Sequence, residues 1–298
     1  MKKFLLTVII FLGAVLIGMQ ASGWRSFDTG TQYNPPYHNA DEGQPDDKPD
    51  GEGRPEPSGM PILGESAYLT ERQVQNMTEW RKAAVELAKQ HPDQVFYCGP
   101  ADRKMVGLTF DDGPDAIITP EVLDVLRDYD VKASFFFKGN RVKKYRSVVK
   151  RALDEGHLVL SHAYSHQELD KMSAYEISRE IEAAEDALWE VTGQRPAMLR
   201  PPFGAVNGDV IKESAQHSHK LILWSIDTLD WSHKDRYHIA RNVLDNVRNG
   251  DIILMHSDED KGETVAALPL IIEGLQKAGY RMVTLDQMLG LEAYKKQN

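Results

Sequence analysis

Apolar residues along this chain recur in two patterns, one typical of buried strands and the other of amphipathic helices. Short runs that are apolar at every position, such as Phe-Phe-Phe at 135–137 and Ile-Ile-Leu-Met at 252–255, separate segments with helical spacing. Such uninterrupted runs indicate strands that are covered on both faces. The predicted strands are Val106–Phe110, Lys132–Phe137, Leu158–Ser161, Ala197–Leu199, Leu221–Ile226, Asp251–Met255 and Arg281–Thr284.

Helical spacing is predicted between these strands. Ser173 with Glu176 forms a capping box at the start of one helix, and Gly193 stands where that helix should end. The predicted helices are Pro120–Tyr129, Val148–Glu155, Ala174–Thr192, Val210–His217, Ile239–Val247 and Val265–Lys277. Strands that alternate with helices favour a closed or nearly closed parallel α/β barrel, and a doubly wound open sheet is the alternative.

The first 64 residues follow neither pattern. Two lysines precede an apolar run over residues 4–19 and small residues follow it, so residues 1–23 are interpreted as a signal peptide or a membrane anchor. Residues 24–64 are rich in Pro, Gly, Asp and Asn and are predicted to be a disordered acidic spacer. We therefore expect an exported protein that is secreted or anchored at the outer face of the cytoplasmic membrane or in the cell wall. An uncleaved run over residues 4–19 would tether it.

Residues 65–103 form a helical lead-in. Thr70 and Gln73 make a capping box, and the helix they start is predicted to end before Pro92. Its apolar stripe is expected to pack against the following domain, with a partner-binding surface as the alternative. The stripe consists of Val74, Met77, Trp80, Ala84, Leu87 and Ala88.

The composition argues against a nucleic-acid-binding protein and against a fold stabilised by disulfides or by a cysteine zinc site. The net charge of -10 over 298 residues, with no basic stripe, argues against a nucleic-acid partner. Cys98 is the single cysteine, so neither an internal disulfide nor a cysteine zinc cluster can form. We expect a monomeric protein whose core is large enough to be stable without covalent cross-links.

Polar residues gather just after the predicted strands, at the end where parallel barrels build active sites. Asp111 and Asp112 follow the first strand, where Gly113-Pro114 breaks the backbone; a solvated turn is the alternative. His162 and His166 follow the third strand with i, i+4 spacing. One carboxylate added to this pair would complete a facial metal site with positions open for water and substrate.

Three further strand ends carry candidate residues. Arg200 precedes two prolines and could orient an acid or make a surface salt bridge. His256 ends the sixth strand, and Asp230 could hold its tautomer and raise its pKa. Trp231 is either a core residue or the wall of an apolar slot.

Five motifs in this order resemble the polysaccharide deacetylases of the NodB-homology type, carbohydrate esterase family 4. They are T-F-D-D-G-P, H-x-x-x-H, R-P-P-F-G, D-T-L-D-W and L-M-H, and the resemblance covers residues 104–291. It implies a distorted (β/α)7 barrel. It also implies a divalent cofactor, zinc first, with Co²⁺, Ni²⁺ or Fe²⁺ as alternatives.

The resemblance also implies a role for each matching residue. Asp111 matches the catalytic base, Arg200 the residue that orients it, and His256 the general acid. Asp230 matches the acid paired with that histidine. The metal ligands match Asp112, His162 and His166, and the substrate-binding positions match Phe203, Trp231, Pro202 and Leu254.

Two positions depart from the family pattern. Ala163 stands where Ser or Thr is usual, and Ser161 is a candidate to replace the lost hydrogen bond. Phe203 stands where Tyr is usual; in the family this residue contributes a backbone N–H to the oxyanion hole.

The expected activity is metal-dependent hydrolysis of N-acetyl groups on a cell-wall or extracellular polysaccharide, of the peptidoglycan or chitin type. An O-acetyl esterase acting on xylan, a glycosidase and an inactive carbohydrate-binding barrel are the alternatives. Because no candidate catalytic residue precedes Asp111, a truncated protein that begins near Leu69 is expected to keep full activity.

Overall fold

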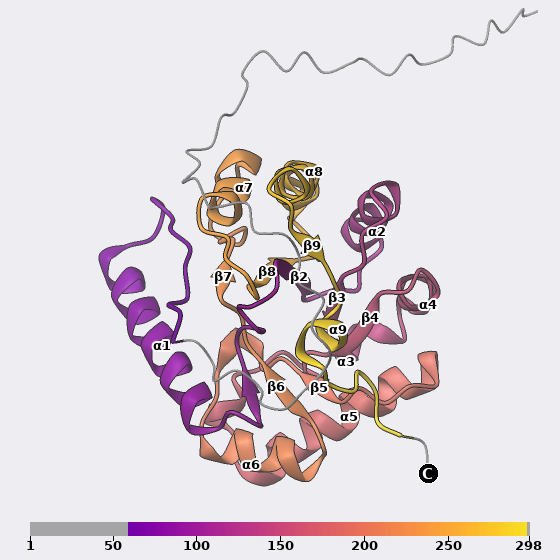
Figure 1. Cartoon of the computed structure of the whole chain (residues 1–298). Coiled ribbons are helices and arrows are strands. Elements are labelled where there is room, and N and C mark those ends of the chain that lie inside the picture. Colours follow the sequence, from indigo (N-terminus) through magenta and orange to yellow (C-terminus); the bar gives the residue numbers. More distant parts are fainter. Residues whose placement is uncertain (1–58, 297–298) are drawn as a thin grey trace, which may run out of the picture. The chain divides into compact units, whose positions relative to one another are not determined.

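The computed structural model describes residues 59–296, which form a parallel sheet with helices packed around it (Figure 1). The predicted segment over residues 1–23 and most of the predicted spacer over residues 24–64 lie outside the described residues. Within residues 59–296, no helix is both long enough and apolar enough to cross a membrane.

The sheet has nine strands. They are β1 (Val95–Phe96), β2 (Met105–Asp111), β3 (Ser134–Phe137), β4 (Leu158–Ser161), β5 (Met198–Leu199), β6 (Lys220–Ile222), β7 (Ile226–Asp227), β8 (Ile252–His256) and β9 (Arg281–Met282). Their order is β1-β6-β5-β4-β3-β2-β8-β7, with β9 on β2, and the pairings are parallel. From β2 to β6 the order runs in one direction without the reversal of a doubly wound sheet. The predicted distorted barrel is confirmed.

The strand predicted over Leu221–Ile226 is in fact two strands, because the chain changes its pairing partner there. The N–H of Leu223 donates to the carbonyl of Phe96, the last residue of β1, at 2.6 Å, whereas the N–H of Ser225 donates to the carbonyl of Ile252 in β8 at 3.0 Å. Trp224 lies between them. This segment thus crosses the opening between the two ends of the sheet.

Helices follow most strands and form a layer around the sheet (Figure 1). They are α1 (Glu71–Gln90), α2 (Ile118–Asp128), α3 (Gly139–Val142), α4 (Arg146–Asp154), α5 (Ala174–Thr192), α6 (Gly208–Gln216), α7 (Arg236–Leu244), α8 (Gly262–Lys277) and α9 (Leu285–Leu289). Both predicted capping boxes are present, at the starts of α1 and α5. The short elements β1, α3 and α9 were not predicted, because β1 has only two residues and helices as short as α3 and α9 do not show a helical period.

Neighbouring strand residues pack into two different apolar clusters. In β3, Phe135 and Phe137 belong to the cluster that includes residues of α2, α4, α7 and α8, whereas Phe136 belongs to the other cluster. This is the two-residue period of a strand with both faces covered. The polar residues at the strand ends are therefore positioned by a sheet that is buried on both faces.

The first described residues belong to the fold. Ile62 is 2% exposed, and Leu63 forms a parallel bridge with Ile226 of β7, in which its N–H donates to the carbonyl of Ser225 and its carbonyl accepts from the N–H of Asp227. The carbonyl of Gly64 accepts a 2.8 Å hydrogen bond from the Arg81 guanidinium. The prediction that the disordered spacer continues to Gly64 is wrong for these residues, because two apolar side chains among Pro and Gly do not produce a readable period.

A truncated protein beginning at Leu69 is therefore expected to be less stable than one beginning at Gly59. Removal of Ile62 and Leu63 exposes apolar surface worth about 2–3 kcal/mol, so the melting temperature should fall by roughly 5 °C. Calorimetry of the two truncated proteins and the full chain measures this difference. Equal melting temperatures for both truncated proteins would contradict the assignment of residues 62–64 to the folded domain.

Candidate active site

The two adjacent acids stand where β2 ends. Asp111 is the last residue of the strand and lies in register with His256 at the end of β8. Asp112 has φ of 73°, in the left-handed region, which Asp tolerates better than most residues. Since the backbone turns at this point, both carboxylates reach the same cavity, as the Gly113-Pro114 break in the sequence predicted.

Asp112, His162 and His166 form a cluster that could hold a metal ion. One ligand atom from each lies within 4.8 Å of the others. The Oδ1 atom of Asp112 is 2.8 Å from Nε2 of His166 and 3.6 Å from Nε2 of His162. This oxygen is buried and has no aligned hydrogen bond among the described residues, so the contacts around it leave its lone pairs available to a cation.

The protonation of this cluster also fits a divalent ion. Burial would raise the pKa of Asp112, but contact with His166 and the charge of the protonated His256 hold it well below its ordinary value. Burial outweighs the nearby carboxylates and lowers the pKa of His162, which keeps this imidazole neutral. The Nδ1 atom of His162 lies 2.7 Å from the carbonyl oxygen of Arg200 and donates to it, so Nε2 presents a lone pair to the cluster. A carboxylate with two imidazole nitrogens is the donor set that zinc and similar ions bind.

Arg200 is buried and holds the carboxylate of Asp111 in place through a hydrogen-bonded ion pair. Its guanidinium is 0% exposed and donates from Nη1 to Oδ1 of Asp111 at 2.8 Å and to Oγ1 of Thr109 at 2.8 Å. Nε and Nη2 donate to the carbonyls of Ile222 and Leu223. Burial lowers the pKa of Arg200 while Asp111 raises it, yet an arginine remains charged at any working pH. The other oxygen of Asp111, Oδ2, lies 3.8 Å from Nε2 of His162, beside the candidate metal site.

His256 and Asp230 form a second hydrogen-bonded pair. Oδ1 of Asp230 lies 2.7 Å from Nδ1 of His256, while Oδ2 accepts from the His256 backbone N–H and from the Thr264 hydroxyl, each at 2.8 Å. Burial alone would lower the pKa of His256, but the charge of Asp230 and its hydrogen bond raise it to about 9. With Nδ1 engaged, Nε2 is the atom left to face the cavity.

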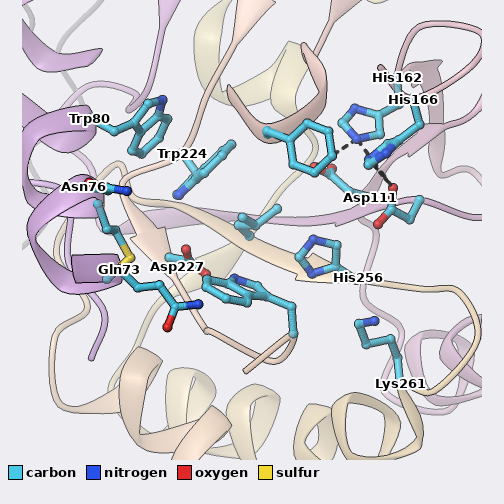
Figure 2. Close-up of a pocket in the computed structure, with 15 residues that line it drawn as sticks. Gln73, Asn76, Trp80, Asp111, His162, His166, Trp224, Asp227, His256 and Lys261 are labelled. Carbon is cyan, nitrogen blue, oxygen red and sulfur yellow. Dashed lines mark ion pairs between the residues drawn. The ribbon is translucent and has the colours of Figure 1, made fainter. Parts of the chain in front are cut away.

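A cavity of about 540 Å³ joins these groups (Figure 2). Eight of the predicted site residues line it, namely Asp111, Asp112, His162, His166, Phe203, Trp231, Leu254 and His256. Its lining residues are Gln73, Asn76, Met77, Trp80, Asp111, Asp112, His162, His166, Phe203, Trp224, Asp227, Trp231, Leu254, His256 and Lys261. Arg200, Pro202 and Asp230 are buried behind this surface.

The loops that carry the site residues adopt strained backbone conformations. Ala163, His166, Phe203 and Leu229 all have positive φ between 56° and 64°, a region that few non-glycine residues occupy. The hydroxyl of Ser161 has no hydrogen-bond partner among the described residues. Ser161 therefore does not supply the hydrogen bond that was expected to replace the one lost at Ala163.

Comparison with known proteins agrees with this geometry. Residues 99–222 match the polysaccharide deacetylase family. Over 195 residues the chain is 38% identical to a peptidoglycan-N-acetylglucosamine deacetylase of Bacillus cereus, and the match covers 64% of this chain and 70% of that protein. This chain belongs to the polysaccharide deacetylase family.

Two other similarities bear on how far the likeness extends. The crystal structure of the Bc1960 peptidoglycan N-acetylglucosamine deacetylase superposes with a TM-score of 0.68 at 35% identity, covering 70% of this chain and 99% of that one. The peptidoglycan-N-acetylglucosamine deacetylase PgdA of Listeria monocytogenes is 40% identical over 187 residues. That match covers 63% of this chain but only 39% of the Listeria protein. The similarity is therefore confined to one region of that longer protein.

Several cavity residues of this deacetylase-family chain were not predicted as site residues. Trp224 lies inside the segment read as one continuous strand, and Asp227 was read as part of a motif without a role. Lys261 lines the cavity near His256, and Lys138 places Nζ 3.5 Å from Oδ1 of Asp112. No spacing rule links these lysines to the motifs, because the loops and strand ends that carry them meet only in three dimensions. The residues from α1 are taken up below.

Proposed function

We propose that this protein is a metal-dependent hydrolase that removes N-acetyl groups from a polysaccharide, producing acetate and a free amine. The observation that carries the proposal is the meeting of three groups at one cavity: the Asp112–His162–His166 cluster, the carboxylate of Asp111 and the imidazole of His256. Hydrolysis of an amide needs an activated water, a base and an acid for the departing nitrogen, and these groups supply all three.

Asp112, His162 and His166 would hold the divalent ion. Zinc is proposed first, because two imidazoles and one carboxylate leave an open position for water and substrate. Co²⁺, Ni²⁺ and Fe²⁺ accept the same donors. When bound, such an ion polarises the acetyl carbonyl and makes its water more acidic.

Asp111 is the proposed base. Arg200 occupies its Oδ1 atom, which leaves Oδ2 on the side of the metal cluster to take the proton of the attacking water. Arg200 and Asp111 lie on different strands, and the two carbonyl contacts of the guanidinium fix its position. Arg200 is thus a positioning residue that keeps the carboxylate aimed in one direction.

His256 is the proposed general acid, and Asp230 keeps it protonated and correctly oriented. Its Nε2–H would donate to the leaving sugar nitrogen as the carbon–nitrogen bond breaks. The backbone N–H of Phe203 is proposed to donate to the developing oxyanion. Trp231 and Leu254 line the cavity beside these groups and would enclose the acetyl methyl group, with Pro202 stiffening the loop behind them.

A peptidoglycan-type glycan is the proposed substrate, with chitin-type N-acetylglucosamine polymers second. The support is the likeness to relatives named as peptidoglycan deacetylases, together with the export segment expected at residues 1–23. We propose that a monomeric catalytic domain acts outside the cytoplasm. Residues 24–58 would separate it from a segment that is cleaved or remains as a tether, and no nucleic acid is involved.

Acetate release from a panel of substrates tests the proposal. Metal-loaded protein is incubated with peptidoglycan, N-acetylglucosamine oligomers and acetylated xylan, and both acetate and new reducing ends are measured. Acetate from the first two substrates, abolished by a chelator and restored by zinc, is the expected result. Activity on xylan alone would establish an O-acetyl esterase, new reducing ends a glycosidase, and binding without turnover an inactive barrel.

A further inference from the structure

Helix α1 presents one face to both the protein core and the cavity. Its residues 73, 76, 80 and 84 follow helical spacing, so their side chains lie on the same side of the helix. In the second half of this face, Ala84 and Ala88 are buried against the domain, as the apolar stripe predicted. In the first half, Gln73, Asn76 and Met77 instead line the cavity.

Trp80 fixes α1 to the loop that follows β5. Its ring stacks on Trp224 with centroids 4.7 Å apart, and its Nε1–H donates to the carbonyl of Gly204 at 3.0 Å. A side chain at Gly204 could not be accommodated, because its Cβ atom would lie 2.4 Å from the Trp80 ring. The first turns of α1 are therefore held at a set position relative to Phe203 and the rest of the site.

The side chains on this part of the cavity have the chemistry that recognises a neutral sugar. Amides and carboxylates pair with hydroxyl and acetamido groups, and indole rings pack on the apolar faces of pyranoses. Gln73 and Asn76 supply amides, Asp227 a carboxylate, and Trp231 an indole that is 44% exposed. Figure 2 shows Gln73, Asn76 and Asp227 on one side of His256. On the other side lie Asp111, His162 and His166.

We propose that the first two turns of α1, with Asp227 and Trp231, form a second sugar subsite that binds the unit next to the one being deacetylated. This inference rests on the proposed function, since the neighbouring unit of the glycan can be located only relative to a sugar whose acetamido group is at the metal cluster. The cavity of about 540 Å³ is far larger than an acetyl group requires, and it runs without interruption from the cluster to α1. The family match begins at residue 99, so this wall is supplied by a segment that precedes the matched region.

Two substitutions test the subsite. Asn76→Ala removes an exposed amide. Gln73→Glu replaces the amide donor but keeps the side-chain oxygen that accepts from Thr70 in the capping box, so the helix start is preserved. Gln75→Ala is the matched control, because Gln75 lies on the same helix, bonds to Glu79 and does not line the cavity. The melting temperature of each variant is measured to confirm that α1 is intact.

The readouts are kcat and KM for acetate release from the di- and tetrasaccharides of N-acetylglucosamine, and calorimetric binding of the tetrasaccharide. Asn76→Ala and Gln73→Glu are expected to raise KM and Kd for the tetrasaccharide about tenfold, which corresponds to one or two lost hydrogen bonds. The rise should exceed any fall in kcat and should appear for the disaccharide as well, since a disaccharide with one unit at the metal cluster already places its second unit in the neighbouring subsite. Gln75→Ala should behave as the unmodified protein.

Each other outcome has a distinct meaning. If the unmodified protein releases acetate and both variants bind the tetrasaccharide equally well, the subsite is refuted and the proposed function stands. If the unmodified protein releases no acetate, the proposed function fails, and calorimetry decides the subsite alone: weaker binding in the variants supports it. Equal binding, or no binding by any of these proteins, overturns it.

Discussion

Asp112→Asn is expected to lose the divalent ion and, with it, essentially all acetate release. Asp112 is the one anionic member of the metal cluster, and an uncharged amide oxygen is a much weaker ligand for such an ion. Mutation of a residue that only hydrogen-bonds a metal ligand typically weakens metal binding by about 10–100-fold, and loss of a ligand itself should weaken it further. Metal analysis of the purified variant, with acetate release measured in parallel, checks this result.

Asp111→Asn is the matched control for this prediction. It makes the same chemical change at the neighbouring residue, but Asp111 is bound to Arg200 and lies beside the cluster rather than in it. This variant should retain its metal and lose turnover for want of a base. Metal loss in Asp111→Asn with retention in Asp112→Asn would reverse the two roles, and loss in both would mean that the pair holds the ion together.

His256→Ala is expected to reduce kcat by about 10²–10⁴-fold while leaving the metal in place, which is the usual contribution of a positioned general acid. The alkaline limb of the kcat/KM profile should also disappear. The pKa of His256 is raised to about 9, so the unmodified protein keeps its acid form below that pH and loses it above. A bound divalent cation lowers this pKa, so the limb is expected at or below about pH 9.

Asp230→Asn distinguishes a general acid from a structural histidine. Removing the negative charge beside Nδ1 disfavours the imidazolium, so the alkaline limb should move to lower pH. A variant that was merely less stable would lower activity at all pH values without moving the limb. A fall in metal content in His256→Ala would instead make His256 a ligand and contradict the division of roles.

The site residues could be predicted because each follows the end of a strand that the sequence makes readable. Phe-Phe-Phe and Ile-Ile-Leu-Met are apolar at every position, and the carboxyl ends of parallel strands meet at one edge of a sheet. Asp111, His162, Arg200 and His256 could thus be expected to lie together before any distance was known. Their order and spacing also carried the resemblance to the family.

Other features could not be predicted because they depend on contacts between distant segments. Leu223 and Ser225 are two residues apart, yet their N–H groups bond to different strands, and nothing in their own sequence marks the change of partner. Ile62 becomes buried in an apolar cluster contributed by distant segments, next to the bridge between Leu63 and β7. Lys138 reaches Asp112 only because the chain after β3 runs past the end of β2.

By itself, the sequence determined the alternation of strands and helices, the capped starts of α1 and α5 and the residues at the strand termini, because period and capping are local properties. The tertiary structure alone decided which part of the apolar face of α1 is core and which part is cavity wall. Met77 and Ala84 belong to one apolar stripe. The sequence of such a stripe looks the same whether its residues pack against the core or line a cavity. The stacking of Trp80 on Trp224 and its hydrogen bond to Gly204 position α1, and thus set where burial stops and the cavity begins.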